Sequence, residues 1–225
     1  RHEAELLARL EHPHIVKLFK VGVSGGQYYL TMEWLEGKTL DQHLDRPPGE
    51  VLPLFLQVVD AVAYLHGQRI IHRDLKPANV IVTSQGAKLI DFGLGKNLAD
   101  SLSLTRQGQV LGTLVFLTPA QLAGEPATPA SDVYALGVIL YRLLSGRYPF
   151  EGANFGEMLR RIKEGRREPL TLRPDLPMPL AGLLRELCEK ALDHRPGRGY
   201  SDAAALAGEL RQVLGGPDGK GPALA

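Results

Sequence analysis

The chain has 225 residues, 44% of them hydrophobic, which is enough to bury one sizeable core or a large lobe with a smaller one attached. Its 26 lysines and arginines nearly cancel its 25 aspartates and glutamates, so the overall charge excludes a strong field toward nucleic acid or an anionic membrane. No apolar run approaches the ~20 residues of a membrane helix and no signal peptide opens the chain, so we expect no membrane segment and a cytoplasmic location.

The cysteine content and the first residue add two expectations. Cys188 is the one cysteine of the sequence and lies at helical apolar spacing, which favours a packed core residue over a catalytic thiol. The sequence begins with Arg1 rather than methionine, within a helix-like pattern, so we expect the natural product to start earlier.

The first third of the chain alternates helical and strand-like patterns. Leucines at helical spacing predict an opening helix, which Pro13 ends. Residues 15–21 and 28–32 have the composition of strands, and the glycine-containing segment 24–26 between them predicts an antiparallel pair. Helical spacing over residues 51–66 then predicts a long buried helix.

The rest of the chain changes from strands to helices. Residues 80–82 and 87–90 predict a short hairpin, and residues 91–129 lack periodicity and are expected to form a long functional loop. Apolar periodicity then predicts helices over residues 132–144, 155–164, 180–192 and 201–214. Strands followed by helices predict an α+β fold with two unequal lobes and a ligand cleft between them, joined near residues 33–37.

The strongest functional signal is a pair of short motifs. Residues 72–79 read His-Arg-Asp-Leu-Lys-Pro-Ala-Asn, and residues 91–93, after the predicted hairpin, read Asp-Phe-Gly. Taken one at a time, the aspartates and the asparagine could be ordinary helix-cap or turn residues. The occurrence of both complete motifs at this spacing argues against that interpretation. The pattern resembles eukaryotic-like serine/threonine protein kinases of the bacterial type.

The resemblance implies roles for four residues of these motifs. Asp74 would orient or deprotonate the substrate hydroxyl, and Lys76 would contact the transferred phosphate, as in the serine/threonine class rather than the tyrosine class. Asn79 and Asp91 would hold magnesium, with ATP as the phosphate donor. Such chemistry requires the metal, the γ-phosphate and the hydroxyl to be held in line.

The resemblance also implies an adenine site between the two lobes. Met32 would be the gatekeeper, and the backbone of Glu33 and Leu35 would meet adenine in the hinge. Ile81 would form part of the adenine floor, although periodicity alone would equally make it strand core. Glu3 would be the helix glutamate that pairs with a strand lysine, whereas as a lone residue it would belong to a solvated helix face.

Further positions would support the catalytic loop. Asp132 would brace the loop backbone, although a helix N-cap is the competing interpretation. Thr113 would hydrogen-bond Asp74 and Lys76, and Gly93 would complete the Asp-Phe-Gly motif. Four residues fall where kinases stack a hydrophobic column through both lobes: Leu7, Leu18, His72 and Phe92.

The sequence departs from the kinase pattern in two places. The glycine-rich loop and the strand lysine that kinases carry ahead of Glu3 are not in the sequence, so we expect the chain alone to be poorly active. Ala120 stands where the family usually has a glutamate, so Arg195 is expected to lack its buried partner, at a cost of ~3–5 kcal/mol. In the activation segment, Thr105 is the candidate phosphosite that would pair with Arg73, the alternative being an exposed loop threonine.

The resemblance predicts a partial small lobe over residues 1–36, a large lobe over 37–214 and a flexible tail over 215–225. The expected function is ATP- and Mg²⁺-dependent phosphorylation of protein serine or threonine. A kinase-like binding module and a small-molecule kinase of the antibiotic-modifying type are the alternatives. A docking face or a solvated helix face could be formed by five basic residues: Arg160, Arg161, Lys163, Arg166 and Arg167.

Overall fold

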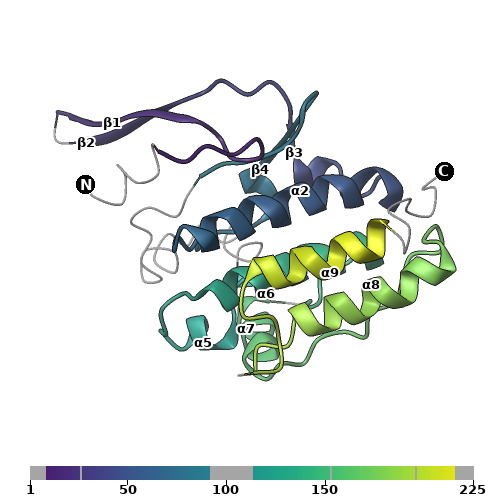
Figure 1. Ribbon diagram of the computed structural model, residues 1–225. Coiled ribbons are helices and arrows are strands. Elements are labelled where there is room, and N and C mark those ends of the chain that lie inside the picture. The colour runs from purple at the N-terminus through teal and green to yellow at the C-terminus, as the bar shows by residue number, and fades with distance from the viewer. Residues whose placement is uncertain (1–8, 26, 92–113, 153, 196, 216–225) are drawn as a thin grey trace.

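The computed structural model describes residues 9–25, 27–91, 114–152, 154–195 and 197–215. Figure 1 shows the strands on one side of the molecule and the helices stacked on the other, with the long helix α2 running between them. This arrangement is the mixed α+β architecture that the order of sequence patterns predicts.

Two strands, β1 (Leu18–Ser24) and β2 (Gln27–Met32), form an antiparallel hairpin, as predicted. The first strand starts three residues later than the sequence pattern suggested. Ile15 and Val16 are each 2% exposed and lie beside Leu89 instead: the Val16 N–H donates to the Leu89 carbonyl at 2.9 Å. Burial of these two side chains in the core therefore outweighs extension of the hairpin.

A second sheet has the order β3 (Lys38–Thr39), β4 (Val80–Thr83) and β5 (Gly86–Leu89). The predicted β4–β5 hairpin is confirmed, with register from Val80 opposite Leu89 to Thr83 opposite Gly86. Strand β3 was not predicted, because two residues carry no periodicity. A side chain at Gly37 would place its Cβ 2.2 Å from the Val82 carbonyl oxygen, so glycine permits this close approach.

The helices confirm the four helical segments predicted for the second half of the chain and the long helix predicted over residues 51–66. Helix α5 was missed because it is one turn long, and its start is defined by a capping box in which Thr118 and Gln121 exchange hydrogen bonds. The observed bounds are α2 (Pro48–Gly67), α5 (Pro119–Leu122), α6 (Pro129–Ser145), α7 (Phe155–Lys163), α8 (Met178–Ala191) and α9 (Ala203–Gly215).

Helix α6 is the centre of the core. It starts at a capping box between Thr128 and Ser131, ends at Gly146 with φ of 76°, and packs against α2, α8 and α9. Cys188 on α8 is fully buried and its thiol donates to the Gly137 carbonyl at 3.6 Å. This confirms the packed-core interpretation, and burial raises the pKa of the Cys188 thiol.

Among the described helices, α2 has the length and apolarity of a membrane span, contrary to the expectation from the sequence. Half of its most apolar 18-residue window is buried within the fold. The helix packs against β5, α6 and α9, so its hydrophobicity is that of a core helix.

A histidine at the edge of the core has unmet hydrogen-bonding capacity. His43 is 7% exposed, and neither ring nitrogen has a hydrogen-bond partner in the part of the chain that the structure describes. Burial, followed by the charges of Arg46 and Lys38, lowers the pKa of His43. The unfolded chain therefore binds more protons than the folded one below pH ~6.5. As the pH falls, His43 thus lowers the free energy of unfolding.

We expect His43→Leu to leave the free energy of unfolding at pH ~7.5 unchanged or higher, because it removes buried polar atoms that lack partners. Below pH ~6.5 the difference in favour of the variant should grow, by at most about 1.4 kcal/mol per pH unit. Urea unfolding from pH ~7.5 to ~5 measures both quantities. A difference that stays constant over this range would contradict the account.

Candidate active site

The loop that follows α2 is held by one carboxylate. The His72 N–H donates to Asp132 Oδ2 at 2.8 Å, and the Arg73 N–H donates to Asp132 Oδ1 at 3.1 Å. Arg73 has φ of 70°, an uncommon conformation for a residue with a side chain. Asp132 is 2% exposed in the first turns of α6, whose N-cap is Thr128. The carboxylate therefore accepts hydrogen bonds from loop N–H groups that have no partner in a helix or strand.

His66 joins this network, and sequence reasoning missed it. Its Nε2 lies 3.0 Å from Asp132 Oδ2, and its Nδ1 accepts the Ala203 N–H at 3.1 Å, at the start of α9. Because Nδ1 accepts, Nε2 carries the proton and donates to Asp132. The sequence signal was only a histidine in the last turn of a predicted helix, which does not distinguish this role from a solvated position.

His72 is fully buried beneath the loop. Its Nδ1 accepts the Asp74 N–H at 3.3 Å, and its Nε2 lies 3.3 Å from the Ile90 carbonyl. Burial lowers the pKa of His72 and outweighs the opposing charge of Asp132, so the neutral ring packs as part of the core. Leu18, predicted to lie in the same hydrophobic column, is also buried, at 4% exposed.

Three predicted catalytic side chains meet at the end of the loop. Asn79 donates from Nδ2 to the Asp74 carbonyl at 2.8 Å and to Asp74 Oδ2 at 2.9 Å. The Lys76 Nζ lies 3.3 Å from Asp74 Oδ1 and 3.2 Å from Oδ2. A single 3-10 turn, η2 (Pro77–Asn79), folds the chain back so that Asn79 reaches Asp74. Asp74 is 9% exposed and Asn79 6%, so this cluster is largely desolvated.

Asp91 is brought toward Asn79 by the β4–β5 hairpin. The Ile90 N–H donates to the Asn79 carbonyl at 2.9 Å, which joins the residue before Asp91 to the start of β4. Asp91 is exposed and has φ of 55°. Asn79 uses its Nδ2 for Asp74, which leaves Oδ1 as the amide atom for a cation.

This donor set fits magnesium. No cluster of three or more His, Cys, Asp or Glu side chains suited to a metal occurs among the described residues. Magnesium is commonly bound through one or two protein oxygens together with water and substrate phosphates, and the Asn79 amide and Asp91 carboxylate supply such hard oxygens. Both would hold the ion only together with a phosphate ligand.

Comparison with known proteins identifies the family. The chain matches the protein kinase domain over residues 1–207. It belongs to the protein kinase domain family.

Bacterial relatives show the same relationship. The chain is 34% identical to the serine/threonine-protein kinase PrkC of Bacillus subtilis (strain 168), over 95% of the chain and 33% of that relative. It is 37% identical to the serine/threonine-protein kinase pkn2 of Myxococcus xanthus, over 92% of the chain and 26% of that relative. With PknA of Mycobacterium tuberculosis (strain CDC 1551 / Oshkosh) the identity is 36%, over 96% of the chain and 51% of the relative. The chain thus spans about a third of the length of PrkC.

The predicted hinge of this kinase domain follows β2. Met32 ends β2 and is 43% exposed, and the side chain of Leu35 packs against the core. The Glu33 N–H donates to the Lys17 carbonyl at 2.9 Å, and Glu33 Oε1 accepts from Lys88 Nζ at 2.8 Å. With its N–H occupied, Glu33 could contact adenine only through its carbonyl.

Ile81 lies in β4, half-buried, opposite Thr39 of β3. Both the adenine floor and ordinary strand core agree with this position, so its role stays a prediction. Several residues to which the resemblance gave roles in this kinase domain lie outside the described residues: Glu3, Leu7, Phe92, Gly93, Thr105 and Thr113.

Arg195, expected to lack its buried partner, has a local carboxylate partner instead. Its side chain is 60% exposed and donates to both carboxylate oxygens of Asp193, at 2.7 and 2.5 Å. This pair holds the pKa of Asp193 down at about 2. A carboxylate two residues away thus replaces the buried partner that Ala120, half-buried in α5, does not supply.

The basic segment around α7 is largely occupied by local ion pairs. Arg161 pairs with Glu157 and Glu168, Arg166 pairs with Glu164, and Arg167 pairs with Glu189. These pairs favour the interpretation as a solvated helix face over a docking face for acidic partners.

We expect Asp132→Ala to lower the free energy of unfolding by at least about 3 kcal/mol. The change would leave the His72 and Arg73 N–H groups and the His66 ring without their acceptor, each at a cost of ~1–3 kcal/mol. Urea unfolding measures the loss. The matched control is Glu50→Ala, which removes an exposed ion pair with Arg46 and should cost less than ~1 kcal/mol. Equal losses in the two variants would contradict the bracing role of Asp132.

Proposed function

We propose that this kinase domain transfers the γ-phosphate of ATP to serine or threonine hydroxyls of proteins. The observation that carries the proposal is the contact set of Asp74, in which Lys76 and Asn79 both lie within hydrogen-bond distance of one carboxylate. Membership in the protein kinase family and the printed names of the bacterial relatives support it.

Asp74 is proposed to orient the attacking hydroxyl and to take its proton. Its Oδ2 is fixed by the Asn79 amide, so the carboxylate cannot rotate freely. A positioned base of this kind contributes roughly 10²–10⁴-fold to a rate. The fixed carboxylate also aligns the hydroxyl, which is the larger need of phosphoryl transfer because this reaction requires little covalent help.

Lys76 is proposed to stabilise charge on the transferred phosphate. Its Nζ lies beside Asp74 and its side chain is 21% exposed. The same cation can therefore contact the Asp74 carboxylate and a phosphate that approaches from solvent. This lysine also supports the choice of serine or threonine over tyrosine as acceptor, by resemblance to the serine/threonine class.

Asn79 and Asp91 are proposed to hold Mg²⁺ with ATP, since they offer an amide oxygen and a carboxylate at adjacent ends of the β4–β5 hairpin. When bound, the ion neutralises phosphate charge. Met32, Glu33, Leu35 and Ile81 are the proposed adenine neighbours. We further propose that this domain works in the cytoplasm, where ATP is available and the buried Cys188 stays reduced.

The test uses the full-length protein, because the chain spans only part of its relatives. We expect Asp74→Asn to reduce transfer of labelled γ-phosphate to protein serine and threonine by at least ~10²-fold. Asp41→Asn, at an exposed aspartate within η1 (Leu40–Gln42), is the control and should retain activity. Unchanged transfer in Asp74→Asn, or transfer only to tyrosine, would refute the proposal. A wild-type protein that binds ATP without transfer would support a binding module instead.

A further inference from the structure

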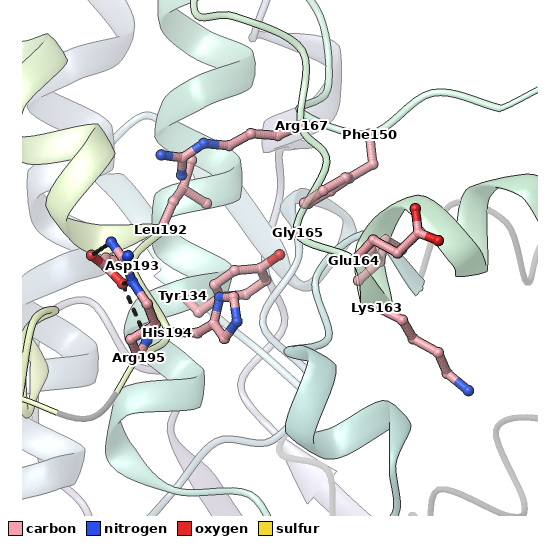
Figure 2. Close-up of a pocket in the computed structure, with 11 residues that line it drawn as sticks. Tyr134, Phe150, Lys163, Glu164, Gly165, Arg167, Leu192, Asp193, His194 and Arg195 are labelled. Carbon is pink, nitrogen blue, oxygen red and sulfur yellow. Dashed lines mark hydrogen bonds and ion pairs between the residues drawn. The ribbon is translucent and has the colours of Figure 1, made fainter.

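A pocket lies away from the catalytic loop, between α6, α7 and the end of α8. Its volume is about 410 Å³, within the ~300–1,000 Å³ typical of small-molecule sites. Of the residues to which the sequence assigned catalytic or regulatory roles, only Arg195 is among its described lining. Figure 2 shows the side chains that surround it. The proposed phosphate transfer makes no use of this pocket.

Part of the pocket wall is apolar and rigid. Phe150, Ile162 and Leu192 line it and are 4%, 0% and 3% exposed. Because these side chains are packed into the core, their positions are fixed before any ligand arrives. A preformed wall of this kind lowers the entropy cost of binding.

The polar group most directly aimed into the pocket is the Tyr134 hydroxyl. Tyr134 is 2% exposed, and in Figure 2 its oxygen points into the space between Gly165 and Leu192. Among the described residues, the fully buried side-chain atoms without a hydrogen-bond partner lie on His43 and Arg142, so the Tyr134 hydroxyl is open to the pocket rather than sealed in the core. Burial raises the pKa of Tyr134, so the group remains an O–H donor at neutral pH. Such a donor calls for an acceptor on a ligand.

Further donors line the same pocket. The His194 ring stands edge-on to Tyr134, with centroids 6.2 Å apart. Arg195 uses two N–H groups on Asp193, and Arg167 donates one hydrogen bond to Glu189, whereas a guanidinium carries five N–H donors. Both arginines therefore retain donors for a further acceptor.

Charge alone does not select the ligand of this pocket. Three cations, Lys163, Arg167 and Arg195, line the pocket together with two carboxylates, Glu164 and Asp193. Figure 2 shows the Lys163 amine directed outward and the Arg195 guanidinium turned toward Asp193. The preference for a ligand with an acceptor group therefore comes from the Tyr134 hydroxyl and the remaining arginine N–H groups.

We infer that this pocket binds a small organic anion whose carboxylate or phosphate accepts a hydrogen bond from Tyr134 while its apolar part lies against Phe150 and Leu192. Tyr134 is two residues from Asp132 on the same helix, so a bound anion would contact the helix that holds the catalytic loop. The pocket and the catalytic site are separate, and binding here does not depend on the proposed kinase activity.

The test measures binding to the full-length protein by ligand-observed ¹⁹F NMR with three probes that share one ring: 4-fluorobenzoate, 4-fluorophenyl phosphate and 4-fluorobenzamide. An anion should bind at least roughly tenfold more tightly than the neutral amide, the order expected for a charge-assisted hydrogen bond. The stronger of the two anions identifies the group that the pocket accepts. Excess ATP with Mg²⁺ should not displace either anion.

Two variants locate the binding. Tyr134→Phe removes only the hydroxyl and should weaken anion binding about five- to tenfold while leaving the amide unaffected. Tyr64→Phe is the matched control, since Tyr64 lies on α2 against His12, and it should bind like the wild type. The inference is overturned if the amide binds as tightly as the anions, if ATP displaces them, if none binds, or if Tyr134→Phe binds anions like the wild type.

Discussion

The buried carboxylate of Asp132 is the interaction on which the geometry of the active site depends. Burying a charge is costly unless hydrogen bonds replace its hydration. Three donors do so here: the backbone N–H groups of His72 and Arg73, and the His66 ring. Through His66 and Ala203 the same network reaches the start of α9. One side chain thus ties together α2, α6, α9 and the catalytic loop.

The positions of the proposed catalytic residues depend on this bracing. Arg73 has a left-handed backbone that is held by the contacts around it, and Asp74 follows directly. Beyond Asp74 the chain needs only one 3-10 turn to return Asn79 to the carboxylate and one short hairpin to bring Asp91 close. The proposed chemistry requires fixed positions rather than reactive side chains, so short elements on a rigid helical base suit it.

The sequence predicted the helices and strands that are long enough to show apolar periodicity. Apolar periodicity located α2 and α6, and the motif at residues 72–79 contains the three side chains that meet, Asp74, Lys76 and Asn79. What it missed depends on contacts between distant segments or on single turns: β3 has two residues, α5 is one turn, and His66 gains its role only when α2 crosses Asp132. The pairing of Arg195 with Asp193 was missed because the family resemblance pointed to a partner at position 120, far away in the sequence. The carboxylate two residues away was therefore not considered.

Amide hydrogen exchange at His72 and Arg73 tests the central claim most directly. If Asp132 holds both N–H groups, they should exchange only through global unfolding, as slowly as the core of α6, although they lie in a loop. In Asp132→Ala the same two amides should exchange much faster while α6 stays protected. Exchange of these amides in the wild type as fast as that of the exposed Gln85 in the β4–β5 turn would contradict the account.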